Sequence, residues 1–149
     1  MAQASSVTNC FTQLQPGHLR LISDVAADDS DKTLTVPATA FWEILWISAS
    51  LASTATAGNR NMRVAVANPA GTVIDTIDAD SVQTASGTEY YHWGYFGAAV
   101  ETPATHHYIP LPTTILPASY TIRIYDSAAV AAAADDLTVN MLVVEYPGG

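Results

Sequence analysis

Residues 41–51, FWEILWISASL, decide the fold class of this chain. The stretch is rich in aromatic and β-branched residues and contains neither Gly nor Pro, which is typical of a β-strand. Because strand side chains alternate between two faces, Trp42 and Trp46 share one face, and Leu45 and Ile47 share the other. Both faces are apolar over the first half. The sequence therefore predicts that one face covers the core and that a second layer or another subunit covers the other.

About eight strand patterns of this kind run along the chain, with turn residues between them. They lie at residues 18–25, 33–36, 41–51, 60–67, 72–77, 90–96, 119–125 and 137–146, with 108–111 as at best a short edge strand. Short strands at this spacing, without alternating helices, predict an all-β fold, and we expect an antiparallel β-sandwich of the jelly-roll type. At most one short helix is expected, at residues 127–136 (SAAVAAAADD), and a loop is the alternative there.

Local patterns also predict which residues face inward and where the chain turns. Residues 60–67 alternate, so Met62, Val64 and Val66 should point into the core. Residues 68–71, Asn-Pro-Ala-Gly, should form a type I turn that closes a hairpin with a bulge. In residues 137–146 both faces are apolar, as in residues 41–51.

A chain of 149 residues fits one domain, and we expect an N-terminal arm at residues 1–16 and a single β-sandwich at residues 17–149. The start of the chain lacks a basic segment followed by an apolar one, so no signal peptide is expected. With Cys10 as the only cysteine, an intramolecular disulfide is excluded. These features predict synthesis and folding in a cytoplasm.

Composition limits the classes of partner. The net charge is −9, and the five Lys and Arg residues are scattered, so neither nucleic acid nor an anionic membrane is expected to bind. Hydrophobic residues make up 49% of the chain and charged residues only 13%. This composition is apolar for a small monomer, whose surface is normally rich in charged residues. It indicates that part of the protein surface is buried between copies of the chain.

No catalytic signature is present, so we predict no enzyme and no catalytic, cofactor-binding or metal-binding residues. His106 and His107 are adjacent and should point to opposite faces, so the two cannot chelate one ion. The acidic residues 28, 29 and 31 alternate as in calcium loops, but without EF-hand spacing a solvated loop is favoured. A polysaccharide hydrolase would need paired carboxylates, for which only Glu43, Glu89 and Glu101 are candidates.

The aromatic stretch at residues 90–96 offers two faces. Tyr91, Trp93 and Tyr95 share one of them, and they could anchor a partner or a carbohydrate. The alternative is that these rings fill the core of the sandwich.

Four segments together resemble small all-β virion proteins of tailed bacteriophages: FWEILWISASL (41–51), TATAGNR (54–60), LPASYTIRIYD (116–126) and DDLTVNMLVVEY (135–146). The resemblance spans roughly residues 36–146 and includes no catalytic motif. It implies a jelly-roll capsid cement or decoration protein on the capsid surface of a virion. Such a protein binds as a homotrimer between subunits of the major capsid protein.

We expect burial of both faces of residues 41–51 and 137–146 to supply the contact between copies. The predicted interface residues are Trp42, Ile44, Trp46, Tyr91, Trp93, Tyr95, Leu142, Val144 and Tyr146. The alternative function is a tail or head-fibre module that binds a host glycan through Tyr91, Trp93 and Tyr95.

Overall fold

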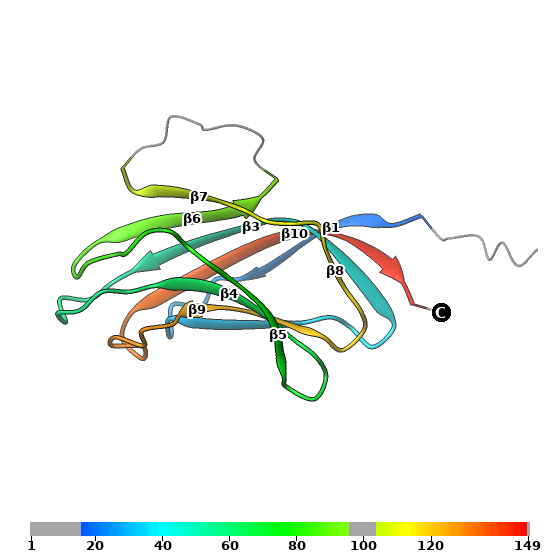
Figure 1. The fold of residues 1–149 in the computed structure, drawn as a ribbon, viewed down its shortest axis with the longest axis horizontal. Helices are drawn as coiled ribbons and strands as arrows, with labels where there is room; N and C mark the ends of the chain where they lie inside the picture. Colours follow the sequence, from blue (N-terminus) through cyan, green and yellow to red (C-terminus); the bar gives the residue numbers. More distant parts are fainter. Residues whose placement is uncertain (1–15, 96–103, 149) are drawn as a thin grey trace, which may run out of the picture.

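The computed structural model describes residues 16–95 and 104–148. Within these residues, ten strands form two sheets that pack face to face (Figure 1). Their bounds are β1 (His18–Asp24), β2 (Asp31–Thr35), β3 (Ala40–Ala52), β4 (Met62–Ala67), β5 (Val73–Asp78), β6 (Thr88–Gly94), β7 (His106–Pro110), β8 (Thr114–Leu116), β9 (Thr121–Asp126) and β10 (Asp136–Pro147).

The strand order is that of a jelly roll. One sheet, sheet A, has the order β1-β10-β3-β6-β7, with β8 paired to β3, and the other, sheet B, has the order β2-β9-β4-β5. The first strand thus pairs with the last and the second with the ninth, while β3 pairs with β6 and β4 with β5. This nesting of antiparallel pairs defines the fold, and it confirms the predicted all-β sandwich. The strands β7 and β8 are additional, and β7 runs parallel to β6.

The core lies between the sheets and comes from regularly alternating strands. In β4 the side chains of Met62, Val64 and Val66 are buried, as predicted. The inward residues of β9 and β10 are fully or almost fully buried: Ile122, Ile124, Leu137, Val139, Met141 and Val143. Alternation therefore located most of the core correctly.

The central strand β3 does not alternate throughout. Opposite β10, the neighbours Leu142 and Val143 pair with Trp46 and Ile44, so Leu45 is an extra residue in β3. Such a β-bulge shifts the alternation by one position. Consequently Trp42 and Ile44 before the bulge, and Ile47, Ala49 and Leu51 after it, all face the core. The bulge thus turns most of both apolar sets inward, but Phe41, Leu45 and Trp46 remain on the outer face. That another subunit covers this face stays a prediction.

Two predictions about turns have clear outcomes. The hairpin between β4 and β5 is confirmed: Gly71 N–H donates to the Asn68 carbonyl at 2.9 Å, and Gly71 has a φ of +82°. Residues 127–135 form tight turns in place of the predicted helix at 127–136, and Asp136 already belongs to β10. The Asp126 carboxylate accepts the backbone N–H groups of Ala128 and Val130, each at 3.0 Å. This local capture of the backbone competes with helix formation.

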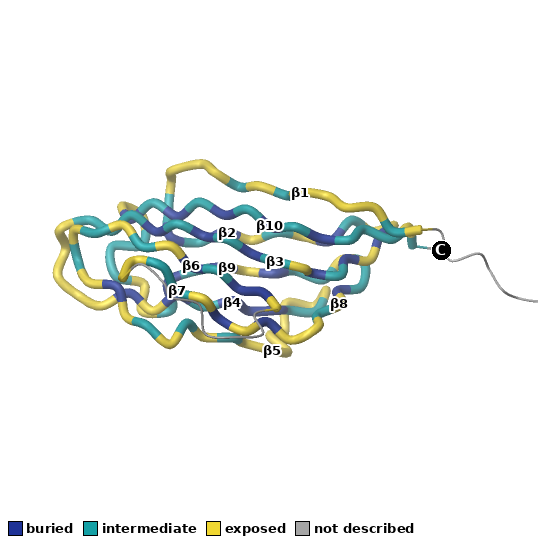
Figure 2. Tube along the Cα trace, turned by 90° about the horizontal axis from the view of Figure 1, so that it is seen from above, coloured by how far each residue is buried: buried dark blue, intermediate teal, exposed yellow. Residues whose placement is uncertain are grey.

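The predicted N-terminal arm lies outside the described residues except for its last position. Seen from above (Figure 2), β1 runs along one edge of its sheet and is largely exposed. No helix in the described part of the chain is long and apolar enough to cross a membrane.

Candidate assembly surface

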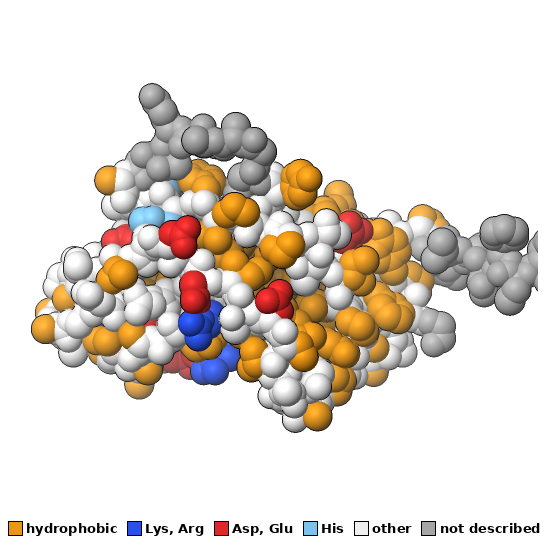
Figure 3. All heavy atoms as spheres, viewed as in Figure 1, with side chains coloured by type: hydrophobic (Ala, Val, Ile, Leu, Met, Phe, Trp, Pro, Cys, Tyr) orange, Lys and Arg blue, Asp and Glu red, His pale blue; other side chains and the backbone are white. Residues whose placement is uncertain are grey.

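An apolar patch covers part of the outer face of sheet A, the face turned away from the core. The register across β1, β10, β3 and β8 brings its members together. We call it the outer patch and define it as Leu19, Leu21, Phe41, Leu45, Trp46, Ile115, Leu142, Val144 and Tyr146. The most exposed are Leu19 at 67%, Ile115 at 61% and Leu21 at 60%. Hydrophobic side chains also gather at the end of the molecule near β8 in Figure 3.

The edge strand β1 is held by polar contacts on its inner side. Arg20 donates to the Glu145 carboxylate at 2.6 Å, and the Trp42 indole donates to the same carboxylate at 2.8 Å. These hydrogen bonds, with that from Trp42 the largest effect, lower the pKa of Glu145. The carboxylate therefore stays ionised near neutral pH and fixes β1 so that Leu19 and Leu21 face outward.

The nine predicted interface residues fall into two groups. Trp42, Ile44, Tyr91 and Trp93 are at most 4% exposed and belong to the core, so their assignment to an interface is corrected. Trp42 and Ile44 face the core on their side of the bulge in β3. Tyr91 and Trp93 lie on the face of β6 that packs against the core. The other five are accessible: Trp46, Tyr95, Leu142, Val144 and Tyr146. They stay candidates for contacts with a partner.

Five members of the outer patch are absent from the predicted interface: Leu19, Leu21, Phe41, Leu45 and Ile115. The alternation of Leu19 and Leu21 with Arg20 was the signal for β1. Nothing in the local pattern indicated β8, because Pro110, Pro112 and Pro117 surround it.

A row of stacked rings lies beside the outer patch on the same face. Tyr90 stacks on His106 with centroids 4.6 Å apart, and His92 stacks on Tyr108 at 4.8 Å. Trp46 joins the row, 6.1 Å from His92. Because adjacent rings cover one another, the row presents mainly ring edges. A flat platform for a sugar through Tyr91 and Trp93 is also excluded by their burial.

A pocket of about 190 Å³ opens where the bulge lies. Glu43, Leu45 and Tyr95 contribute to its lining, together with Leu111 and residues 112–113. Tyr95 is 87% exposed, and the Glu43 carboxylate accepts the Tyr146 hydroxyl at 3.0 Å. The pocket thus combines an apolar wall, an exposed ring and a carboxylate.

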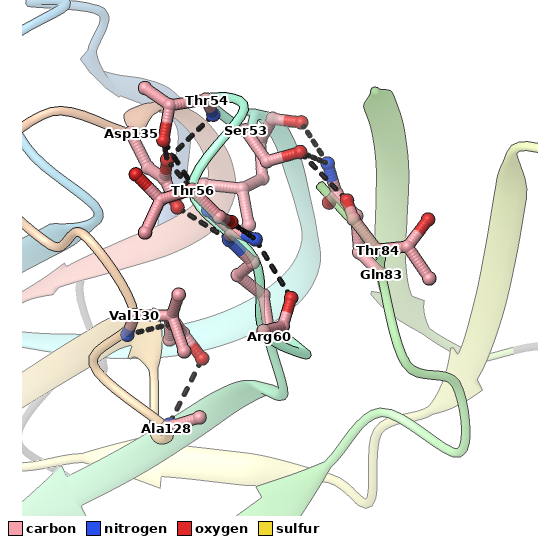
Figure 4. Close-up of polar contacts among 12 residues, drawn as sticks. Ser53, Thr54, Thr56, Arg60, Gln83, Thr84, Ala128, Val130 and Asp135 are labelled. Carbon is pink, nitrogen blue, oxygen red and sulfur yellow. Dashed lines mark hydrogen bonds and ion pairs between the residues drawn. The ribbon is translucent and has the colours of Figure 1, made fainter. Parts of the chain in front are cut away.

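A buried ion pair closes one end of the sandwich (Figure 4). The Arg60 Nε donates to Asp135 at 2.7 Å, and both side chains are fully buried. Thr54 adds two hydrogen bonds to Asp135, each at 2.7 Å, through its backbone N–H and its hydroxyl. Burial raises the pKa of Asp135, but the hydrogen bonds from Arg60 and Thr54 outweigh this and lower it. Because Arg60 and Thr54 both donate to Asp135 inside the protein, we interpret this cluster as one that stabilises the fold.

The acidic residues 28 and 29, together with Asp24, surround the side chain of Lys32. The buried Lys32 ammonium lies 3.8 Å from Asp24 and 3.6 Å from Asp29, and it also pairs with Asp28. Asp31 pairs instead with Arg123. The position that a calcium ion would take among these carboxylates is therefore held by an internal cation.

The two candidate carboxylates that the structure describes, Glu43 and Glu89, have different surroundings. Glu43 lies on the outer face of β3, whereas Glu89 lies at the far end of that sheet and pairs with His107 at 2.7 Å. Glu101 lies outside the described residues. Within residues 16–95 and 104–148, no group of three or more His, Cys, Asp and Glu side chains is arranged to hold a metal ion.

Comparison with known proteins adds weak likenesses only. No family model and no curated protein matches the chain. Among solved structures, a protein of infectious bursal disease virus, Gx strain, is 13% identical over 86% of this chain, with a TM-score of 0.39. A turnip yellow mosaic virus protein is 11% identical over 99% of this chain and 89% of its own, with a TM-score of 0.32.

A third likeness is to pili of Bacillus endospore appendages, at 13% identity over 90% of this chain and 94% of that chain, with a TM-score of 0.28. This chain spans about a third of the length of the bursal disease virus protein, 32%. At such scores none of these likenesses bears on function. The assignment of the jelly-roll class therefore depends on the strand order of the chain itself.

Proposed function

We propose that this protein is a structural protein of a bacteriophage virion, a capsid cement or decoration protein that assembles as a homotrimer. The observation that carries the proposal is the outer patch, which leaves large apolar side chains exposed on one sheet face. Contiguous apolar surface of this kind marks protein–protein contact sites. The resemblance of four segments to phage virion proteins supports the same function.

In this proposal the outer patch faces other copies of the chain or the major capsid protein. Burial of a leucine side chain contributes about 1.5–3 kcal/mol, so Leu19 and Leu21 alone supply a substantial drive for association. The acidic, cation-poor surface elsewhere keeps the assembled protein soluble. Jelly rolls serve capsids and lectins alike, so the fold is compatible with the proposal and does not choose between these functions.

The test uses two matched double variants. Leu19→Asp/Leu21→Asp places charge in the outer patch, and Val73→Asp/Ile74→Asp places it on β5 of sheet B, where Val73 and Ile74 are 55% and 56% exposed. Light scattering of the wild type should give three times the monomer mass. The first variant should give monomers that no longer bind capsids, and the second should remain trimeric. A monomeric wild type at high concentration would overturn the proposal.

A second candidate function is a tail or head-fibre module that binds a host glycan. The observation that favours it is the pocket beside Tyr95, because a ring and a carboxylate together can contact the face and the hydroxyl groups of a sugar. The test measures binding of the fluorescently labelled protein to host cells. Loss of binding in Tyr95→Ala, with binding kept in the Leu19→Asp/Leu21→Asp variant, would support this candidate. Equal binding by Tyr95→Ala and the wild type would eliminate it.

A further inference from the structure

Two histidine side chains from neighbouring parallel strands meet at the ring row, beside the outer patch. His92 on β6 and His106 on β7 place Nε2 and Nδ1 3.3 Å apart. The ring centroids are 5.5 Å apart, and the ring planes differ by 13°. The distance between the ring centroids exceeds the distance between the two nitrogens by about two ring radii, so the rings lie end to end. The small angle between the ring planes makes them nearly coplanar. The two nitrogen atoms therefore face each other directly.

We propose that His92 and His106 form a binding site for a divalent transition-metal ion of the class that prefers imidazole, such as Zn²⁺, Cu²⁺ or Ni²⁺. Zinc–nitrogen bonds of about 2.0–2.1 Å at a tetrahedral ion put two ligand nitrogens roughly 3.3 Å apart, which is the separation found here. When the ion binds, the proton of this hydrogen bond moves through solvent to the other ring nitrogen of the same histidine, so that both facing nitrogens carry lone pairs. Both rings must also turn, because the ion lies beside the line that joins the two nitrogens.

The surroundings hold both ligands in place. Tyr90 stacks on His106 and Tyr108 stacks on His92, so each imidazole is packed against a tyrosine from the adjacent strand. This packing holds the two imidazoles beside each other, within reach of one ion. The third histidine of this region differs. His107 is committed to Glu89 at 2.7 Å and stacks on the buried Tyr91 at 5.0 Å.

The pair supplies only part of the coordination of an ion. Imidazole binds a metal ion in its neutral form. The described residues supply two ligands and no third carboxylate, thiol or imidazole to the same ion. Water completes the coordination, so the affinity should be micromolar, weaker than that of a four-ligand structural site.

The experiment is calorimetric titration of ZnCl₂ into the full-length protein, without an affinity tag and previously treated with chelator. His92→Gln and His106→Gln test the ligands, and His107→Gln and His18→Gln are matched controls. We expect one ion per chain for the wild type and both controls, and at least a tenfold weaker affinity for either ligand variant. Titration at pH 5.5 should weaken binding to the wild type because protons compete for the imidazoles.

A second readout places the ion. Trp42 and Trp93 are buried in the core, so Trp46, 6.1 Å from His92, is the tryptophan beside the proposed site. CuCl₂ should quench tryptophan fluorescence in the wild type and in His107→Gln, and quenching should be largely lost in Trp46→Phe and in His106→Gln. Circular dichroism verifies that each variant is folded. If His92→Gln does not fold, His106→Gln still tests whether the pair binds the ion.

Three outcomes would overturn the inference. The first is no binding of Zn²⁺ by the wild type at a hundredfold excess. The second is undiminished affinity in the folded ligand variants. The third is an adventitious ion only, shown by equal losses in His18→Gln and His92→Gln. Because the readouts concern the ion alone, they remain valid whether or not the protein proves to be a virion component.

Discussion

At the scale of single residues, opposite charges are placed differently in the core and on the surface. Arg60 and Asp135 are fully buried, while Arg63 and Asp78 form an exposed pair of the same chemical type. Removing one partner of a buried pair leaves a charge without compensation, whereas exposed pairs contribute little. The two arginines therefore provide a matched comparison within one chain.

Arg60→Leu should lower the free energy of unfolding by about 3–5 kcal/mol, because the Asp135 carboxylate remains buried and unpaired. Arg63→Leu should change it by less than about 1 kcal/mol. Urea denaturation followed by circular dichroism measures both values. Similar values for the two variants would show that the cluster at the end of the sandwich does not stabilise the fold.

Stability should also depend on His92 as the pH falls. The pKa of His92 is lowered in the folded protein by burial and by His106 and His107, so the unfolded chain binds its proton more readily. Stability is therefore lost as the pH decreases below the unfolded value of about 6.5 and continues to fall until the folded pKa is passed.

The measurement is the melting temperature at pH 7.5 and at pH 5.0 with chelator present. The wild type should melt at a lower temperature at pH 5.0, and the decrease should be smaller in His92→Gln. His18→Gln is the control, because its histidine lies on β1, outside the ring row. An equal decrease in the wild type and His92→Gln would remove His92 as the cause.

At the scale of elements, the bulge in β3 controls which side chains enter the core. Leu45 is the extra residue, so deleting it restores a regular ladder in which Trp42, Ile44 and Ile47 still face inward. Deleting Ser48 instead would turn one half of the strand outward, because a shift by one residue exchanges the two faces.

We expect the Leu45 deletion to fold cooperatively, with a free energy of unfolding within about 2 kcal/mol of the wild type. The Ser48 deletion should not fold. Thermal unfolding monitored by near-ultraviolet circular dichroism distinguishes the two proteins. If the Leu45 deletion also failed to fold, the bulge would be needed for folding itself, beyond its effect on the register between β3 and β10.

At the scale of the whole molecule, association should conceal the outer patch. Trp46 belongs to the patch, while the other two tryptophans are in the core at all times. Quenching of fluorescence by acrylamide should therefore decrease as the protein concentration rises. The Leu19→Asp/Leu21→Asp variant should show no such dependence. Concentration-independent quenching of the wild type would contradict assembly through this face.

Trp46→Asp is the most direct change at this scale. A charge within the outer patch should give monomers or insoluble protein, and light scattering combined with a solubility assay measures this. A soluble trimer of unchanged stability would show that Trp46 lies outside the contact between copies.

The all-β class, most of the strands and the inward faces of regularly alternating strands were predictable from the amino-acid sequence. This follows because burial of alternate side chains is a local property, as Met62, Val64 and Val66 show in β4. The hairpin turn at Asn68 and Gly71 was predictable for a similar reason, since turn chemistry is set by adjacent residues.

Features that depend on pairing between distant segments became visible in the folded chain alone. The bulge at Leu45 arises from the register with β10, and it moved Trp42 and Ile44 from the predicted interface to the core. The meeting of His92 and His106 depends on the parallel pairing of β7 with β6. Such contacts join residues far apart in the chain, and no local pattern of side chains specifies them.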